Sequence, residues 1–205
     1  MDLSSYRKKV IFIGPTRSGK STLVNNFRYN KFKTLPTSGI DFHSFMKNNK
    51  YFDIWDTSGE EKFKDVIKIY FYQVDSVFLF VDFSKNIVDL QNIIKKWGKF
   101  VSKQIRNRNN DNKYIYKFNL VLTYEVEINK ILYHDSKRNF INDLYSKIFD
   151  NIIYINPKKF HDTKLFFDNY IFDTEKQNKK QNEKQTNNNY QSLEEKNKCF
   201  CCSIL

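Results

Sequence analysis

The residues best suited to chemistry form a short run near the N-terminus. This run reads Gly-Pro-Thr-Arg-Ser-Gly-Lys-Ser from position 14 to position 21, with the spacing G-x-x-x-x-G-K-[ST]. With that spacing, backbone N–H groups converge on phosphate oxygens, the lysine places a positive charge beside the outer phosphates, and the last hydroxyl ligates Mg²⁺. The run therefore predicts a phosphate-binding loop made by Gly14, Arg17, Ser18, Gly19, Lys20, Ser21 and Thr22.

The residues on either side of the loop support this interpretation. Residues 10–13 are Val-Ile-Phe-Ile, which favours a short buried strand, and a helix is expected to begin at residues 21–27. Strand, loop and helix in this order are the context that the motif requires, and a helix N-terminus adds partial positive charge. The alternative is a glycine-containing surface loop.

A second group of chemically competent residues follows residues 51–55, which predict another strand. It reads Asp-Thr-Ser-Gly-Glu-Glu from position 56. An aspartate at the carboxyl end of a strand, beside a phosphate loop, can hold Mg²⁺ through water, which gives Asp56 a metal-binding role. Gly59 would let the backbone approach the terminal phosphate. The alternative is an ordinary strand-to-helix turn capped by Asp56.

The rest of the chain alternates strands with helices. Strands are predicted at 77–81, 118–122 and 152–155, and helices at 87–105, 136–149 and 164–172. This alternation predicts an α/β fold with a mostly parallel sheet covered by helices on both faces. A chain of 205 residues is long enough for one domain with a full core and a tail.

These motifs, in this order, resemble those of the Ras superfamily of small GTPases, and within it the Rab branch. Residues 36–42 are similar to the switch I signature and residues 55–63 to the switch II signature. Residues 69–72, Ile-Tyr-Phe-Tyr, stand where Rabs carry a pair of tyrosines. The resemblance covers about residues 7–172 and implies a P-loop G domain with a six-stranded sheet over residues 1–172.

The resemblance also implies site residues for GTP or GDP with Mg²⁺. Thr37 would bind Mg²⁺ and the γ-phosphate with Ser21 and Asp56, and Phe32 would lie beside the base. The catalytic positions would be Lys20, Gly59 and Glu60.

Three aromatic residues match the triad that Rabs present to effectors, namely Phe42, Trp55 and Tyr70. An exposed aromatic cluster suits a binding hot spot. Three aromatic side chains near two strands equally suit a hydrophobic core.

Three departures from the family pattern affect the phosphate side of the site. Arg17 replaces a small residue; its cation would contact phosphate, pair with Glu60 or point to solvent. Glu60 replaces the glutamine that orients the attacking water, so it lacks the amide donor and adds negative charge, and slow hydrolysis is expected. A role for Glu60 as a general base is the alternative. Only four residues separate Phe32 from Thr37, so switch I is short.

The largest departure concerns the residues expected to read the base. The family's Asn-Lys-x-Asp aligns with Tyr-Glu-Val-Glu at 124–127, where Tyr124 offers an aromatic surface and Glu127 keeps a carboxylate. The family's Ser-Ala-Lys aligns with Asn-Pro-Lys at 156–158, where Pro157 lacks a backbone N–H and Lys158 is retained. Because each lost contact costs about 1–3 kcal/mol, base discrimination is expected to be weak.

The C-terminal part of the chain has a different composition. Residues 173–198 are nearly all Lys, Asn, Gln, Glu and Thr, which predicts a disordered tether. Residues 199–205 hold all three cysteines and end in Cys-Ser-Ile-Leu, a prenylation signal whose terminal Leu favours geranylgeranyl. Cys201 and Cys202 resemble the double-cysteine ends of Rabs, so a lipid anchor on the cytoplasmic face of an endomembrane or vesicle, cycling with the cytosol, is expected.

The net charge of +12 is spread over a chain rich in Lys and Asn, including an expected surface loop at 103–113. No basic and aromatic interleaving marks a nucleic-acid groove, so no nucleic-acid partner is expected. No apolar run reaches the length of about 18 residues needed for a membrane span.

The sequence therefore favours a Rab-like GTP/GDP switch in vesicle trafficking with slow hydrolysis. Its implied partners are effectors, exchange factors, activating proteins and a prenyl-Rab escort or extraction factor. A non-hydrolysing, lipid-anchored pseudo-GTPase scaffold is the alternative, and a P-loop kinase acting on ATP is a distant third.

Overall fold

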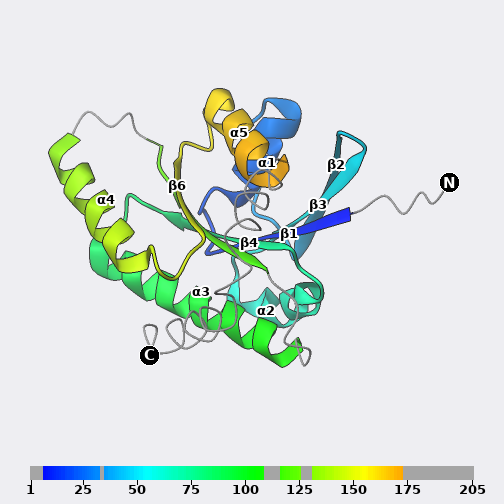
Figure 1. The fold of residues 1–205 in the computed structure, drawn as a ribbon, viewed down its shortest axis with the longest axis horizontal. Coiled ribbons are helices and arrows are strands. Elements are labelled where there is room, and N and C mark those ends of the chain that lie inside the picture. Colours follow the sequence, from blue (N-terminus) through cyan, green and yellow to red (C-terminus); the bar gives the residue numbers. More distant parts are fainter. Residues whose placement is uncertain (1–6, 33–34, 109–115, 126–130, 173–205) are drawn as a thin grey trace, which may run out of the picture.

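The computed structural model describes residues 7–32, 35–108, 116–125 and 131–172. A six-stranded sheet in the order β2-β3-β1-β4-β5-β6 forms its centre (Figure 1). All neighbouring strands are parallel except β2 and β3, which are antiparallel, so the predicted mostly parallel α/β sheet is confirmed. The strands are β1 (Arg7–Ile13), β2 (Ile40–Lys47), β3 (Lys50–Thr57), β4 (Ser76–Asp82), β5 (Lys117–Thr123) and β6 (Asn151–Ile155).

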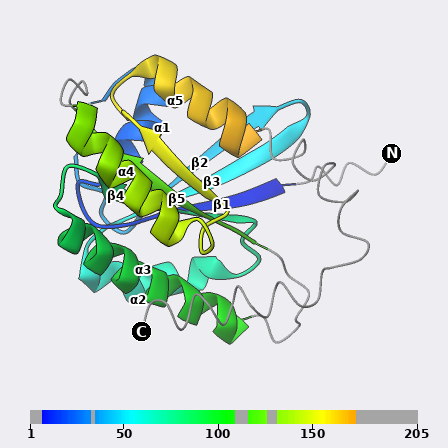
Figure 2. The ribbon, with the colours of Figure 1, turned by 60° about the vertical axis from the view of Figure 1, so that its left-hand side comes forward.

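Helices cover both faces of this sheet (Figure 2). One face carries α1 (Lys20–Tyr29) and α5 (Phe160–Phe166), which a π-helical turn continues over Phe167–Phe172. The other carries α2 (Lys64–Ile67), α3 (Ile87–Arg108) and α4 (Ile131–Tyr145). Short 3₁₀ turns, Glu61–Phe63 and Lys68–Phe71, flank α2.

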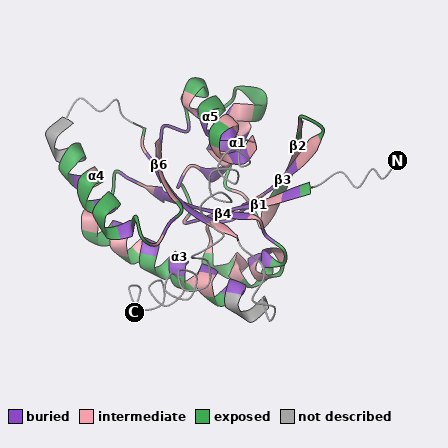
Figure 3. Cartoon of the chain, in the orientation of Figure 1, coloured by how far each residue is buried: buried purple, intermediate pink, exposed green. Residues whose placement is uncertain are grey.

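Two hydrophobic cores result, one on each face of the sheet. In β1, Ile11 and Ile13 pack with the α3 side, whereas Val10 and Phe12 pack with the α1 and α5 side. All four side chains are fully buried, as expected for a strand covered on both faces. Figure 3 shows the buried residues concentrated in the central strands.

The strand order places a crevice at the end of β1. The connection that follows β1 runs to β2 and β3 on one side, whereas the connection from β3 crosses β1 to reach β4 on the other side. Ligands of such sheets bind at this reversal, outside the carboxyl ends of the strands. The loop that follows Ile13 therefore occupies the favoured position for a site.

Strand β2 is the element that sequence patterns did not locate. It lies at the edge of the sheet, and its side chains are only partly buried or exposed, so it carries no apolar run. Its position follows from the turn to β3, where Asn48 and Asn49 have φ values of 53° and 58°. Positive φ at both central residues makes a tight hairpin that matches strand twist.

Helix α3 corrects the prediction of a surface loop at 103–113, because residues 103–108 continue the helix to Arg108. Trp97, Val101 and Ile105, spaced by four residues, stay buried along the core face of the helix. Because this face packs against the core, the chain stays helical even where most of the neighbouring residues are polar. Residues 109–115 lie outside the described part of the chain.

The last helices also differ in their bounds from the prediction. Helix α4 covers 131–145 rather than 136–149, since the chain tightens after Tyr145, whose carbonyl accepts the N–H groups of Ile148 and Phe149. Phe149 then packs against Phe118, with ring centroids 4.7 Å apart. Helix α5 begins at Phe160, four residues earlier than predicted.

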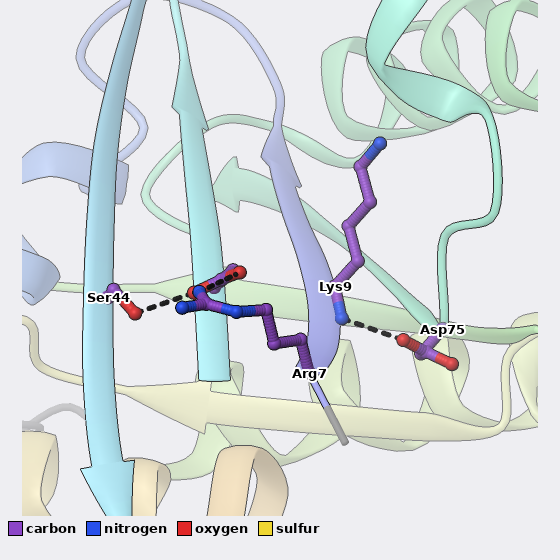
Figure 4. A network of polar contacts seen from close by, with 5 residues as sticks. Arg7, Lys9, Ser44 and Asp75 are labelled. Carbon is purple, nitrogen blue, oxygen red and sulfur yellow. Dashed lines mark hydrogen bonds and ion pairs between the residues drawn. The ribbon is translucent and has the colours of Figure 1, made fainter. Parts of the chain in front are cut away.

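A polar network ties three strands together at the N-terminal end of β1 (Figure 4). Arg7 Nη1 lies 3.0 Å from Asp53 Oδ2, and Ser44 Oγ donates to Asp53 Oδ1 at 2.6 Å. The Lys9 backbone N–H donates to Asp75 Oδ2 at 2.7 Å. This end is opposite the crevice, so the network sets strand register rather than forming a site.

Candidate functional site

The loop between β1 and α1 has a backbone that demands glycine at its start. Gly14 has φ of 135°, and an added Cβ would lie 2.1 Å from the Phe80 carbonyl oxygen. Arg17 adopts φ of 64° although it is not glycine, and it is exposed. The loop lines a pocket of about 260 Å³, together with residues of both switch segments.

Lys20 lies buried beneath the loop. Its ammonium donates to the carbonyl oxygens of Gly14 and Pro15, both at 2.9 Å, and to Ser18 Oγ at 3.1 Å. Burial lowers the pKa of Lys20 to about 8, against an opposing effect of the Asp56 carboxylate. The side chain is therefore charged at pH 7 and positioned by three acceptors.

Three predicted metal-binding residues meet beside the pocket, which Ser21 and Thr37 line. Ser21 Oγ and Thr37 Oγ1 are 2.7 Å apart, and Thr37 Oγ1 donates to Asp56 Oδ2 at 3.5 Å. Thr37 thus reaches Ser21 despite the short switch I. Two hydroxyls and a carboxylate are the hard oxygen donors that Mg²⁺ prefers, so these residues fit the ion.

Asp56 is the most perturbed carboxyl of this group. It is fully buried, and burial raises its pKa to about 6, which hydrogen bonds from Ser21 and Thr37 and the charge of Lys20 oppose. Its Oδ1 atom has no hydrogen-bond partner among the described residues. A buried carboxylate oxygen without a partner is costly, which is the expected signature of a site for a cation.

Gly59 packs directly against the phosphate loop. An added Cβ would lie 2.1 Å from the Thr16 nitrogen and 2.3 Å from the Pro15 carbonyl carbon. Only glycine permits this approach. Glu60 follows at the pocket rim, where its carboxylate pairs with Lys62 at 2.8 Å.

Of the three roles considered for Arg17, pairing with Glu60 is not what the structure shows. Glu60 takes Lys62 as its partner, and Arg17 lines the pocket from the opposite segment. Phe32 is 55% exposed and is not among the residues lining this pocket. Residues 33–34, between Phe32 and Thr37, lie outside the described part of the chain.

The loops expected to read the base lie next to the phosphate loop. Pro157 Cγ would be 3.1 Å from a Cβ added at Gly19, and Lys158 Nζ pairs with Glu125 Oε2 at 2.9 Å. Tyr124 is half-buried, and its N–H donates to the Ile155 carbonyl. Glu127 lies outside the described residues.

Residues that sequence reasoning missed hold these loops in place. Thr123 Oγ1 donates to the Ser18 carbonyl at 3.1 Å, which ties β5 to the phosphate loop. Asn26 of α1 donates to the Pro157 carbonyl at 3.0 Å, and Asn156 donates to the Glu125 carbonyl at 3.3 Å. The sequence signal for Thr123 was its position directly after the predicted strand at 118–122, as the last residue of β5 in the structure.

The three aromatic residues predicted to face effectors form one row. Ring centroids of Phe42 and Trp55 are 4.7 Å apart, and those of Trp55 and Tyr70 are 4.5 Å apart. Phe42 is 49% exposed, whereas Trp55 and Tyr70 pack partly against the core. The row therefore packs against the edge of the hydrophobic core and also presents an aromatic surface to solvent.

The predicted lipidation site at Cys201 and Cys202 lies outside the described residues. Of the helices in the described part of the chain, none combines the length and the apolar composition needed to cross a bilayer.

The fold and the pocket define a P-loop nucleotide-binding domain of the small-GTPase class. Residues 9–119 match the family model described as the Ras of Complex, Roc, domain of DAPkinase. The chain therefore belongs to the Ras-like GTPase domains, and its similarities make it Rab-like.

Three relatives illustrate these similarities. The chain is 34% identical to Ras-related protein Rab-7B of Dictyostelium discoideum over 86 residues, 40% of this chain and 44% of the relative. It is 36% identical to Ras-related protein Rab-4 of the same organism over 98 residues, 45% and 47% of the two chains. A probable Rab-related GTPase of Acanthamoeba polyphaga mimivirus is 39% identical over 70 residues, 31% and 33%. The chain thus spans less than half the length of these relatives.

Proposed function

We propose that the chain binds GTP and GDP with Mg²⁺ and acts as a membrane-recruited switch in vesicle trafficking, with slow intrinsic hydrolysis. The observation that carries this proposal is the pocket lined by Lys20, Ser21 and Thr37, with Asp56 in contact with Thr37 and Gly59 against the loop. The relatives bear Rab names, which supports the trafficking role.

The residues of the pocket divide the work of binding and hydrolysis. Ser21, Thr37 and Asp56 would hold Mg²⁺, which when bound neutralises charge on the outer phosphates. Lys20 contributes a fixed positive charge to the same phosphates. Gly59 places backbone beside the loop, and Glu60 stands at the rim where an attacking water must be oriented.

Glu60 is the reason to expect slow turnover. A carboxylate accepts hydrogen bonds but donates none, and it brings negative charge toward a transition state that is already anionic. The ion pair with Lys62 also holds the side chain toward that lysine. A non-hydrolysing scaffold is the alternative, and single-turnover measurements separate the two.

The test is titration of the purified full chain with fluorescent GTP, GDP, ATP and XTP, with and without Mg²⁺. Lys20→Ala is expected to abolish binding, whereas the matched control Lys147→Ala, at an exposed position, leaves it unchanged. GTP is expected to bind better than ATP. The ratio of the two affinities is expected to be one to three orders of magnitude smaller than the roughly 10⁴-fold ratio of a fully paired base site. Unaltered GTP binding by Lys20→Ala would refute the proposal.

A further inference from the structure

A cluster of possible metal ligands lies on β2 and β3 and shares Asp56 with the magnesium-binding residues. One ligand atom each of Asp41, His43 and Asp56 lies within 4.8 Å of the other two. Asp41 and His43 are two residues apart on β2 and so share a face of the strand. Asp41 is directly opposite Asp56 in the antiparallel pair, which brings their carboxylates together.

Two like charges face each other in this cluster. Two carboxylates directly opposite each other on neighbouring strands repel, which a bound cation would relieve. Neither Asp41 nor Asp56 forms an ion pair with another described residue. The Lys20 ammonium donates its hydrogen bonds to Gly14, Pro15 and Ser18 instead.

The two carboxylate oxygens of Asp56 have different surroundings. Its Oδ2 accepts from Thr37, whereas its Oδ1 is buried and accepts no hydrogen bond from the described residues. Asp41 is exposed, so an ion can enter from solvent. The cluster therefore combines an orphaned buried oxygen, an accessible carboxylate and an imidazole.

The ring of His43 is available as a ligand. Arg28 Nη1 lies 3.4 Å from His43 Nδ1, and since arginine can only donate, this nitrogen carries a lone pair. A contact of 3.4 Å is weak, so an incoming ion can displace it.

We propose that Asp41, His43 and Asp56 bind a first-row transition-metal ion of the Zn²⁺ class. Imidazole with carboxylates selects such ions over Mg²⁺, which prefers oxygen donors alone. Ligand distances near 2.0–2.2 Å require donor atoms about 3.4 Å apart, so the three side chains must close slightly around the ion. Bound there, the ion joins the start of β2 to Asp56 and restrains the segment that carries Thr37.

The experiment titrates the full chain with Co²⁺, whose visible spectrum reports coordination, in excess Mg²⁺ to occupy the oxygen-donor site. We expect one equivalent of Co²⁺ to bind, with displacement by Zn²⁺. His43→Gln and Asp41→Asn are each expected to weaken binding at least roughly tenfold. His161→Gln, at an exposed histidine of α5, is the matched control and leaves it unchanged.

Arg28→Gln adds a variant that is expected to tighten Co²⁺ binding, because it removes a positive charge beside His43. If His43→Gln binds Co²⁺ as tightly as the parent chain, the ion sits elsewhere and the proposal is overturned. Because no nucleotide is needed, this result is independent of whether the chain binds GTP.

Discussion

At the scale of single residues, the site is built from buried charges that folding alone would avoid. Lys20 and Asp56 are both buried. Burial lowers the pKa of Lys20 and raises the pKa of Asp56, so it favours the neutral form of each side chain. Such groups persist at positions where a ligand supplies the missing partner. Glu60 differs, since it sits at the rim and pairs with Lys62.

Replacing Asp56 by Asn is expected to stabilise the nucleotide-free chain by about 1–3 kcal/mol at pH 7 while weakening Mg²⁺-dependent nucleotide binding. The folded-state pKa of Asp56 is raised to about 6, so the folded form of the parent loses stability as pH rises from about 4 through 6. Urea denaturation at pH 7 and pH 4.5 should therefore show a smaller difference between variant and parent at pH 4.5. Asp143→Asn, at an exposed position, is the control, and an equal difference at both pH values would contradict the assignment.

Replacing Glu60 by Gln is expected to raise the single-turnover rate of GTP hydrolysis roughly tenfold, which corresponds to about 1.4 kcal/mol of barrier. The amide supplies a donor to the water and removes a negative charge from the rim of the pocket. Rapid-quench measurement with saturating Mg²⁺·GTP tests this, with Asp65→Asn as a control at an exposed acid of the same segment. A lower rate would mean that Glu60 itself acts as the base.

At the scale of elements, switch II is held against α3 by charged and aromatic contacts. Glu61 Oε2 pairs with Lys64 at 2.8 Å, and its Oε1 pairs with Lys96 of α3 at 2.6 Å. Hydrogen bonds from Lys64 and Lys96 hold the pKa of Glu61 below its usual value. The Lys64 ammonium lies 4.9 Å from the centre of the Trp97 ring, which adds a cation–π contact.

Replacing Lys96 by Met is expected to loosen this attachment. Exposed ion pairs contribute about 0.5 kcal/mol, so amide exchange over residues 61–71 should accelerate about two- to threefold while β1 and β4 are unaffected. Hydrogen-exchange mass spectrometry checks this against Lys99→Met, an exposed lysine three residues further along α3. Equal effects of the two variants would show that Glu61 does not anchor switch II to α3.

At the scale of the whole molecule, the described domain precedes a tail whose composition differs from it throughout. The domain buries its apolar residues on both faces of the sheet, whereas residues 173–198 carry too few to build a core. The proposed attachment to membranes therefore depends on the cysteines near the C-terminus.

Replacing both Cys201 and Cys202 by Ser is expected to move the protein from membranes to the cytosol. Replacing either one alone should give a partial shift, because one lipid chain supports only marginal membrane residence. Cell fractionation with the Cys199→Ser variant as control measures the distribution. Persistent membrane association of the double variant would place the anchor elsewhere.

Features of this protein that depend on local spacing could be predicted from the amino-acid sequence. The phosphate loop, the Asp56–Gly59 segment and five of the six strands follow from short patterns, because a loop that binds phosphate and a doubly buried strand each need particular neighbours in the chain. The predicted roles of Lys20, Ser21, Thr37 and Asp56 led to residues that the fold brings together.

Features that depend on contacts between residues far apart in the chain could be seen only in the folded protein. Strand β2 exists because a hairpin pairs it with β3, and residues 103–108 are helical because Ile105 packs in the core. Asn26 supports the loop at Pro157 through a partner far away in the chain, which no spacing rule reveals. The same holds for Asp41 and His43, which approach Asp56 only after β2 and β3 pair, so their common chemistry belongs to the fold rather than to any motif.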